Sequence, residues 1–217
     1  MKLLNYIFII SLAILIVGCN GNTKSESDEK VKSEEKKEDQ GTNKETKSES
    51  DESKIYKVKS GHLMYNTTMG MTIETWFDDY GNTQYTESLI EIMGQKSGSY
   101  SYIIDGYRYD YNVGEIEGRK AKYYAAQSYN YDNVTQKEID KYGLEFYPDE
   151  TIQGKTCEVI SIESPVESKV WIWEGIPMKT VSKLGKEDFV MEIVEIETGS
   201  VDKSKFELPE GVTFIEQ

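Results

Sequence analysis

The sequence predicts a mainly β domain of the α+β class. We expect a single curved antiparallel sheet of about eight to ten strands with one or two short helices. Runs rich in Val, Ile, Thr, Tyr and Trp alternate in polarity with period two, and turn residues separate them. Short links between such runs favour antiparallel pairing of neighbours. The pattern occupies residues 55–217, a length typical of one domain.

Residues 1–18 have the layout of a secretory signal peptide. Lys2 precedes an apolar run from Tyr6 to Val17, shorter than the roughly 20 residues that a transmembrane helix needs. The run ends in Ile16-Val17-Gly18-Cys19, which resembles the lipobox of bacterial lipoproteins. This resemblance implies cleavage before Cys19, a diacylglyceryl cysteine with further acylation such as palmitate, and an extracytoplasmic place on the cell membrane or outer membrane. An uncleaved anchor helix with an incidental cysteine is the alternative.

Residues 19–54 are predicted to be the lipidated cysteine and a disordered, charged tether. From Asn20 to Lys54 the only apolar residue is Val31, so the segment cannot bury enough surface to offset its ordering entropy. Charges of both signs alternate along it, which is typical of a solvated coil. We interpret it as a spacer between membrane and domain, and a partner-binding tail is the alternative.

The β pattern gives nine expected strands in chain order. They are residues 55–65, 71–77, 83–90, 100–104, 107–111, 155–163, 169–173, 177–184 and 187–197. Asp105-Gly106 is the strongest turn signal, because this dipeptide between alternating strands favours a type I′ hairpin. The resulting register places Tyr100 opposite Tyr111 and Tyr102 opposite Tyr109. These four tyrosines are therefore expected to form a ladder on one face.

One helix is predicted from a capping box. Thr135 and Glu138 have the spacing at which each side chain caps the other's backbone amide, and Gly143 is placed to end the helix in a left-handed conformation. A second short helix is expected near residues 119–126.

Two of the expected strands are apolar on both faces. Residues 169–173 contain Trp171 and Trp173 on one face, and Val170 and Ile172 on the other. In residues 187–197 one face carries Phe189, Met191 and Ile193, and the other carries Val190, Val194 and Ile196. A solvated antiparallel sheet would keep one polar face. We therefore expect a curved sheet whose interior is either a filled core or a ligand cavity. The candidate ligand-binding residues are Trp171, Trp173, Tyr100, Tyr102, Tyr109 and Tyr111.

No catalytic constellation is recognisable. The single histidine, His62, lies in an expected strand, and Cys157 is interpreted as a buried, inert thiol. The acidic pairs Asp78-Asp79 and Asp149-Glu150 are interpreted as turn and loop residues, because neither fits a calcium loop. A carboxylate-based hydrolase that uses Asp78 or Asp149 is the alternative. We therefore predict no enzymatic activity, no metal and no cofactor. The formal charge of −14 also argues against binding to nucleic acid, which requires a basic surface.

The C-terminal third resembles a known family. The stretches Val170–Lys179 and Val201–Val212 look like the end of the lipoprotein carriers LolA and LolB, with an aromatic strand, a G-x-P-x-K turn and a final D-x-x-x-F-x-x-P-x-G segment. The resemblance implies an open half-barrel, a strongly curved sheet with one or two short helices on its concave face, which encloses a cavity for acyl chains. It implies no catalytic residues. This chain differs from such soluble carriers in two respects: it is expected to be lipidated, and it is acidic. We expect a membrane-anchored, non-enzymatic lipoprotein that binds a lipid or other apolar ligand; a closed-core regulator or assembly factor that contacts an envelope protein is the alternative.

Overall fold

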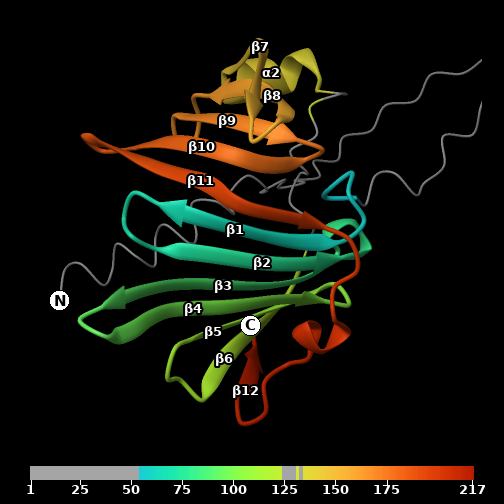
Figure 1. Cartoon of the computed structure of the whole chain (residues 1–217), viewed down its shortest axis with the longest axis vertical. Helices are drawn as coiled ribbons and strands as arrows, with labels where there is room; N and C mark the ends of the chain where they lie inside the picture. Colours follow the sequence, from blue (N-terminus) through green and yellow to red (C-terminus); the bar gives the residue numbers. More distant parts are fainter. Residues whose placement is uncertain (1–53, 124–130, 132–133) are drawn as a thin grey trace, which may run out of the picture.

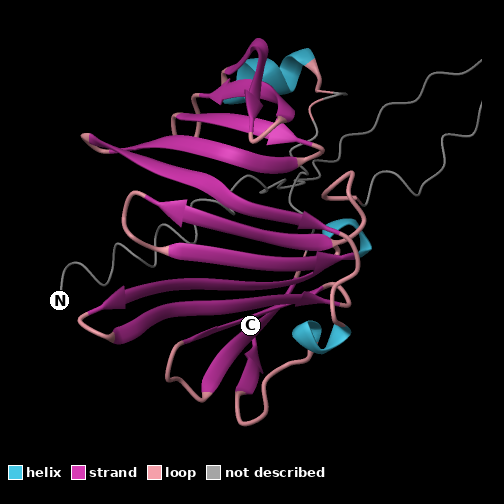
Figure 2. Ribbon diagram, in the orientation of Figure 1, coloured by secondary structure: helices cyan, strands magenta, loops and turns pink. Residues whose placement is uncertain are grey.

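The computed structural model describes residues 54–123, 131 and 134–217. These residues form one sheet of twelve strands in the order β12-β6-β5-β4-β3-β2-β1-β11-β10-β9-β8-β7. Figure 1 shows the strands stacked as a twisted, curved sheet, and Figure 2 shows how little of it is helical. The two edge strands, β12 and β7, do not pair with each other, so the sheet stays open. The predicted fold class is confirmed, although the strands outnumber the expected eight to ten.

The strands are β1 (Gly61–Thr67), β2 (Thr72–Asp78), β3 (Thr83–Ile92), β4 (Gln95–Ile104), β5 (Tyr107–Asn112), β6 (Glu117–Lys122), β7 (Leu144–Ile152), β8 (Lys155–Ile162), β9 (Ser168–Trp173), β10 (Ile176–Leu184), β11 (Glu187–Thr198) and β12 (Thr213–Glu216). The helical elements are α2 (Gln136–Tyr142) and two 3₁₀ turns, η1 (Asp79–Gly81) and η2 (Lys203–Phe206).

Two antiparallel meanders make up the sheet. Within β1 to β6, and within β7 to β11, each strand pairs with the next, and β1 joins the two sets by pairing with β11. The last strand, β12, lies parallel to β6. The sequence analysis missed β6, β7 and β12. Asp149, expected in a loop, lies in β7, where a bulge between Tyr147 and Glu150 accommodates Pro148 and its missing amide donor.

The hairpin between β4 and β5 has the expected register. Tyr100 pairs with Tyr111, and Tyr102 pairs with Tyr109. Asp105 (φ 51°) and Gly106 (φ 75°) both adopt positive φ, as a type I′ turn requires. The tyrosine ladder predicted from the dipeptide is therefore present.

The predicted helix is confirmed as α2. The Thr135 hydroxyl accepts a hydrogen bond from the Glu138 amide, the Glu138 carboxylate accepts one from the Thr135 amide, and Gly143 closes the helix at φ 60°. However, α2 lies beside β7 at one end of the sheet and buries none of its residues, so it does not cover the central strands (Figure 1). The second expected helix is wrong in its described part, because Glu117–Lys122 pair with β5 as β6; residues 124–126 lie outside the described residues.

The main core lies against the middle of the sheet. Its largest members that are almost inaccessible to solvent are Phe77, Leu63, Ile176, Met178 and Ile193. Strand β9 is buried on both faces, as predicted: Trp171 and Trp173 join this core, whereas Val170 and Ile172 join a second cluster around Ile160.

Strand β11 departs from the predicted split of its apolar residues. Phe189, Met191 and Ile193 enter the core as expected, but Ile196 also packs there. A bulge opposite Met64 and Tyr65 of β1 shifts the register of β11 and so changes which residues face the core. Val194 is left 45% exposed.

The segment before β1 closes one end of the core instead of extending the strand. Residues 55–65 were expected as one strand, but β1 begins only at Gly61. The amides of Ile55 and Tyr56 both donate to the Tyr80 carbonyl, and the Tyr56 ring packs edge-on against Phe77 at 4.8 Å.

No helix in the part of the chain that the structure describes is long and apolar enough to cross a membrane. The predicted signal peptide and almost all of the tether lie outside the described residues.

Candidate binding face

Eight aromatic side chains form a continuous stripe across one face of four neighbouring strands, β2 to β5, and the edge strand β12. We call this the aromatic stripe: Trp76, Tyr85, Tyr100, Tyr102, Tyr107, Tyr109, Tyr111 and Phe214. The stripe follows from register, because residues two apart share a face of a strand and cross-strand partners face the same way. Trp76 pairs with Tyr85 and Tyr85 with Tyr102, so aromatic alternation in each strand adds up across the sheet.

The rings are stacked closely along the stripe. Ring centroids are 5.4 Å apart for Trp76 and Tyr85, and 4.5 Å apart for Tyr85 and Tyr102. Tyr100 stacks on Tyr111 at 4.9 Å, and Phe214 of β12 meets Tyr109 edge-on at 5.2 Å. These separations lie in the favourable range for aromatic pairs. The stripe is therefore a rigid surface with few rotatable groups.

The centre of the stripe is buried and its flanks are half-exposed. Tyr85 and Tyr102 are 8% and 5% exposed, whereas Tyr100, Tyr107, Tyr109 and Tyr111 are accessible to an intermediate degree. Burial, followed by a hydrogen bond to the Glu87 carboxylate, raises the pKa of Tyr85, and burial also raises the pKa of Tyr102 and Tyr111. These hydroxyls stay neutral at physiological pH and can donate hydrogen bonds.

Lysines cover the stripe at two places. The Lys205 ammonium of η2 lies 3.9 Å from the Trp76 ring centroid, and Lys120 of β6 lies 4.3 Å from that of Tyr107. Each distance is within cation–π range. The segment that links β11 to β12 thus bounds the stripe beside Trp76.

The two tryptophans predicted together with the tyrosines lie elsewhere. Trp171 and Trp173 are on β9, separated from β4 in the sheet by β3, β2, β1, β11 and β10. Trp171 is 9% exposed, and its indole nitrogen donates to Glu150 at 2.9 Å. Trp173 packs on the main core and is covered by Lys155. The structure therefore brings four of the six candidate ligand-binding residues together and separates the other two.

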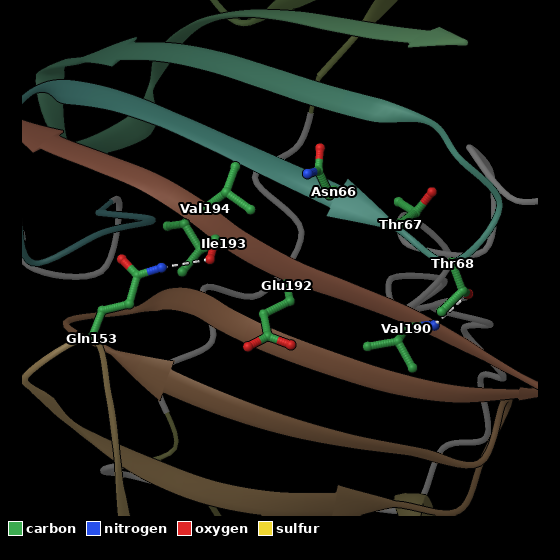
Figure 3. Close-up of a pocket in the computed structure, with 8 residues that line it drawn as sticks. All are labelled: Asn66, Thr67, Thr68, Gln153, Val190, Glu192, Ile193 and Val194. Atoms are coloured by element: carbon green, nitrogen blue, oxygen red, sulfur yellow. Dashed lines mark hydrogen bonds between the residues drawn. The ribbon is translucent and has the colours of Figure 1, made fainter. Parts of the chain in front are cut away.

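An open depression lies where the two sets of strands meet, at β1 and β11. Its volume is about 490 Å³, within the range typical of small-molecule sites, and Figure 3 shows its lining from β1, β11 and the β7–β8 turn. Gln153 of that turn donates to the Ile193 carbonyl at 2.7 Å and so ties the turn to β11. The lining residues are Asn66, Thr67, Thr68, Gln153, Val190, Glu192, Ile193 and Val194.

The acidic pairs have local structural partners. The Asp78 carboxylate accepts a hydrogen bond from the Asp79 amide and caps η1. Glu150 accepts from Trp171 and lies 3.8 Å from the Lys169 ammonium.

Cys157 is fully buried, as predicted, and burial raises the pKa of its thiol. A buried thiol of high pKa is a poor nucleophile.

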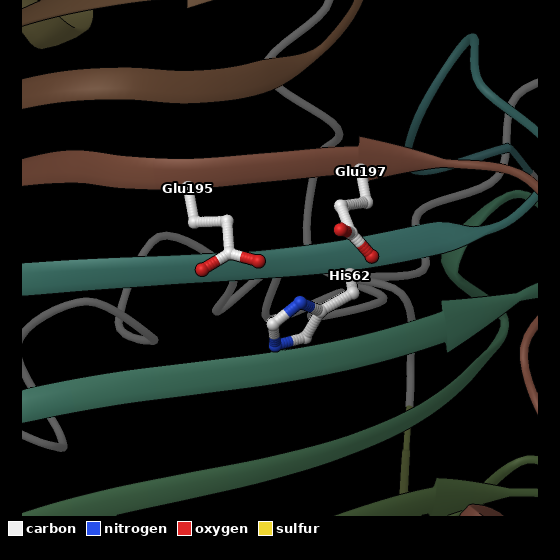
Figure 4. Close-up of side chains that lie close together, drawn as sticks. All are labelled: His62, Glu195 and Glu197. Carbon is white, nitrogen blue, oxygen red and sulfur yellow. The ribbon is translucent and has the colours of Figure 1, made fainter.

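His62 belongs to a cluster that the sequence analysis did not identify. Its Nε2 atom lies 2.8 Å from a Glu74 carboxylate oxygen, and its ring stacks on Trp76 with centroids 4.9 Å apart. One histidine nitrogen and one oxygen each from Glu195 and Glu197 lie within 4.8 Å of one another (Figure 4). Such a donor set could hold a metal ion. The sequence alone could have shown that Glu195 and Glu197 share one face of a strand, because they are two residues apart. It could not have shown that this face lies beside His62.

Comparisons with known proteins match the fold and a short C-terminal segment. Residues 172–212 match a domain of unknown function, DUF4412. No curated protein matches the sequence. An uncharacterized conserved protein from Thermus thermophilus has a similar structure, with a TM-score of 0.53 over 74% of this chain and 91% of that chain, at 8% identity. This likeness shows a shared fold and nothing about activity.

Two further structures align more loosely. The MucA/MucB complex of Pseudomonas aeruginosa gives a TM-score of 0.44 at 11% identity, covering 72% of this chain and 57% of that one. A putative outer membrane lipoprotein-sorting protein domain from Vibrio parahaemolyticus gives 0.28 at 10% identity, covering 69% and 88%. Neither score supports an argument about this protein, so the resemblance to LolA and LolB stays a prediction.

Proposed function

We propose that the protein is a lipid-anchored, non-enzymatic module of the cell envelope that binds a partner protein through the aromatic stripe. The observation that carries this proposal is a row of stacked tyrosines whose flanks are half-exposed. Tyrosine and tryptophan are enriched at protein interfaces because they supply large contact areas at a low entropic cost, and tyrosine adds a polar tip. The stripe offers both properties on a rigid support.

The charge of the domain defines the chemistry of the partner. Residues 55–217 carry a formal charge of −12, so a basic protein surface would be attracted and an acidic one repelled. Anionic lipid head groups would be repelled as well, so attachment to the membrane falls to the acyl chains on Cys19. The tether would then let the stripe reach a partner some distance from the membrane.

The local roles of the candidate catalytic groups support a binding function. The Cys157 thiol is buried, and Asp78 and Glu150 are engaged by neighbouring groups. Nucleophilic catalysis would require an accessible nucleophile within hydrogen-bond reach of a base.

Site-specific photo-crosslinking in cells tests the proposal. A photoreactive phenylalanine analogue would replace Tyr100 or Tyr111 in the full chain, with Tyr147 of the edge strand β7 as the matched control, since Tyr147 is 40% exposed and lies outside the stripe. We expect one defined protein adduct from the stripe positions and none from the control. Equal labelling of all three positions, or no protein adduct from either stripe position, would contradict the proposal.

An apolar ligand is a second candidate, favoured by the depression beside β11. Val190, Ile193 and Val194 line part of it, and its volume of about 490 Å³ suits an acyl chain or a similar molecule. Native mass spectrometry of the protein purified from cells would detect a bound lipid. If Val194→Glu removes that lipid while stripe variants retain it, this second function gains support; if no lipid is bound and added fatty acids leave tryptophan fluorescence unchanged, the carrier function fails.

A further inference from the structure

A histidine and three glutamates from three neighbouring strands converge on one face of the sheet. His62 of β1 lies opposite Glu197 of β11, while Glu195, two residues earlier, pairs with Met64. Glu74 lies on the other side of β1, in β2, where it also pairs with Met64. Because residues two apart share a face, all four side chains point to the same side. Figure 4 shows both β11 carboxylates beside the His62 ring.

The contact with Glu74 fixes the orientation of the imidazole. Nε2 lies 2.8 Å from the Glu74 carboxylate, and an ionised carboxylate can only accept hydrogen bonds. Nε2 therefore carries the proton, and in the neutral ring Nδ1 keeps a free lone pair. Stacking against Trp76 holds the plane of the ring, and the histidine side chain is only 13% exposed. This is the arrangement in which metal-binding histidines are held by an outer carboxylate.

Glu195 and Glu197 of β11 have no basic partner in the described part of the chain, unlike Glu192 on the same strand. Among the described residues, no lysine or arginine forms an ion pair with Glu195 or Glu197, whereas Glu192 pairs with Lys179 at 3.1 Å. The oxygens of Glu195 and Glu197 lie within 4.8 Å of each other and of a histidine nitrogen. Like charges at this distance repel, and a bound cation would replace that repulsion with attraction.

We propose that His62, Glu195 and Glu197 bind one divalent transition-metal ion of the Zn²⁺ class, with Glu74 as a positioning residue. One imidazole and two carboxylates form a mixed nitrogen and oxygen set, which suits Zn²⁺ and related ions, whereas Ca²⁺ and Mg²⁺ prefer oxygen ligands alone. Three protein ligands leave a coordination position open to water or to a group from a partner. Trp76 belongs to both the stripe and this site, but metal binding by these three ligands does not require the stripe to bind a partner.

Titration of the full chain in detergent with Zn²⁺ alone, followed by calorimetry, tests the site. We expect one equivalent to bind, and His62→Gln, Glu195→Gln and Glu197→Gln each to weaken binding at least tenfold. Glu74→Ala should weaken it by about 10–100-fold, the usual effect of removing an outer-shell partner, and Glu74→Gln should restore part of the affinity because its amide oxygen still accepts from Nε2–H. The matched control is Glu192→Gln, which removes a neighbouring charge already neutralised by Lys179 and should change the affinity less than threefold.

Thermal unfolding adds a readout that distinguishes a site from general electrostatic attraction. Without Zn²⁺, Glu195→Gln should unfold at the same or a higher temperature than the parent chain, since the substitution relieves repulsion. With saturating Zn²⁺ the order should reverse, because only the parent gains binding energy. Any one of three results would overturn the proposal. The parent chain binds no equivalent of Zn²⁺, Glu192→Gln loses as much affinity as the ligand variants, or the melting temperatures keep the same order with and without Zn²⁺.

Discussion

Replacing Trp171 with alanine distinguishes a core tryptophan from one that lines a ligand cavity. The side chain is 9% exposed and belongs to the main core, so its removal leaves a cavity among tightly packed neighbours. Deleting a buried aromatic side chain costs about 3–5 kcal/mol. The hydrogen bond to Glu150 adds little to this figure, because the Glu150 side chain is 52% exposed and water can replace the indole donor.

A chain of residues 20–217, which lacks Cys19, retains every described residue and suits equilibrium unfolding in urea. For a domain of this size, 3–5 kcal/mol corresponds to a fall in melting temperature of roughly 6–20 °C. Trp171→Phe keeps most of the buried surface and should cost only about 1 kcal/mol. The matched control is Phe146→Ala on β7, where the ring is 52% exposed and its loss should stay within about 0.5 kcal/mol.

The result that would refute this reasoning is a small loss of stability. If Trp171→Ala unfolds within about 1 kcal/mol of the parent while a bound lipid disappears from the purified protein, then Trp171 lines a ligand cavity, one of the two alternatives that the strand pattern left open. If the loss is large and the slope of the unfolding curve is unchanged, Trp171 is part of a filled core.

Three other measurements test the lipid anchor, the tether and the buried tyrosines. Cys19→Ala should abolish acylation, detected by mass spectrometry, and release the chain from membranes; a variant that stayed acylated and bound would contradict the lipobox. Limited proteolysis should cut residues 20–54 before any bond in residues 80–200, and the reverse order would contradict a folded domain behind a tether. The raised pKa values of Tyr85 and Tyr111 contribute stability that is fully present below their ordinary value of 10 and is lost as pH rises above it. The folded protein should therefore become steadily less stable above pH 10, and absorbance at 295 nm should show fewer ionised tyrosines than in urea.

Local chemistry made the hairpin and the helix predictable. The turn at Asp105 and Gly106 requires positive φ at both positions, and few dipeptides tolerate this, so two residues defined both the turn and the register of the ladder. The capping box at Thr135 and Glu138 likewise depends on groups within one helical turn. In both cases the deciding interactions lie within a few residues of each other along the chain.

The missed elements depend on contacts between distant residues. Strand β12 is only four residues long and forms because Phe214 packs over Gly118, where a side chain would leave no room for the ring. The bulge that brings Ile196 into the core arises from pairing with β1, which no local pattern in β11 reveals. The same pairing brings His62 and Glu195 together although they are far apart in the sequence, so the residues around His62 could not reveal the cluster.

The distribution of polarity over β3, β4 and β5 argues that the aromatic stripe was not selected for stability alone. In a sheet with one solvated face, the apolar side chains face the core. Here the face opposite the stripe carries Thr86, Ser101 and the ion pair between Arg108 and Asp110 beside one buried apolar residue, Ile103. The only β3–β5 side chain packed on the main core is Ile90. The stripe is therefore the main apolar face of these strands, and solvent reaches its flanks. Its half-exposed flanks support the proposal that the stripe is an interaction surface, because a side-chain pattern chosen only for folding would have buried all of these rings.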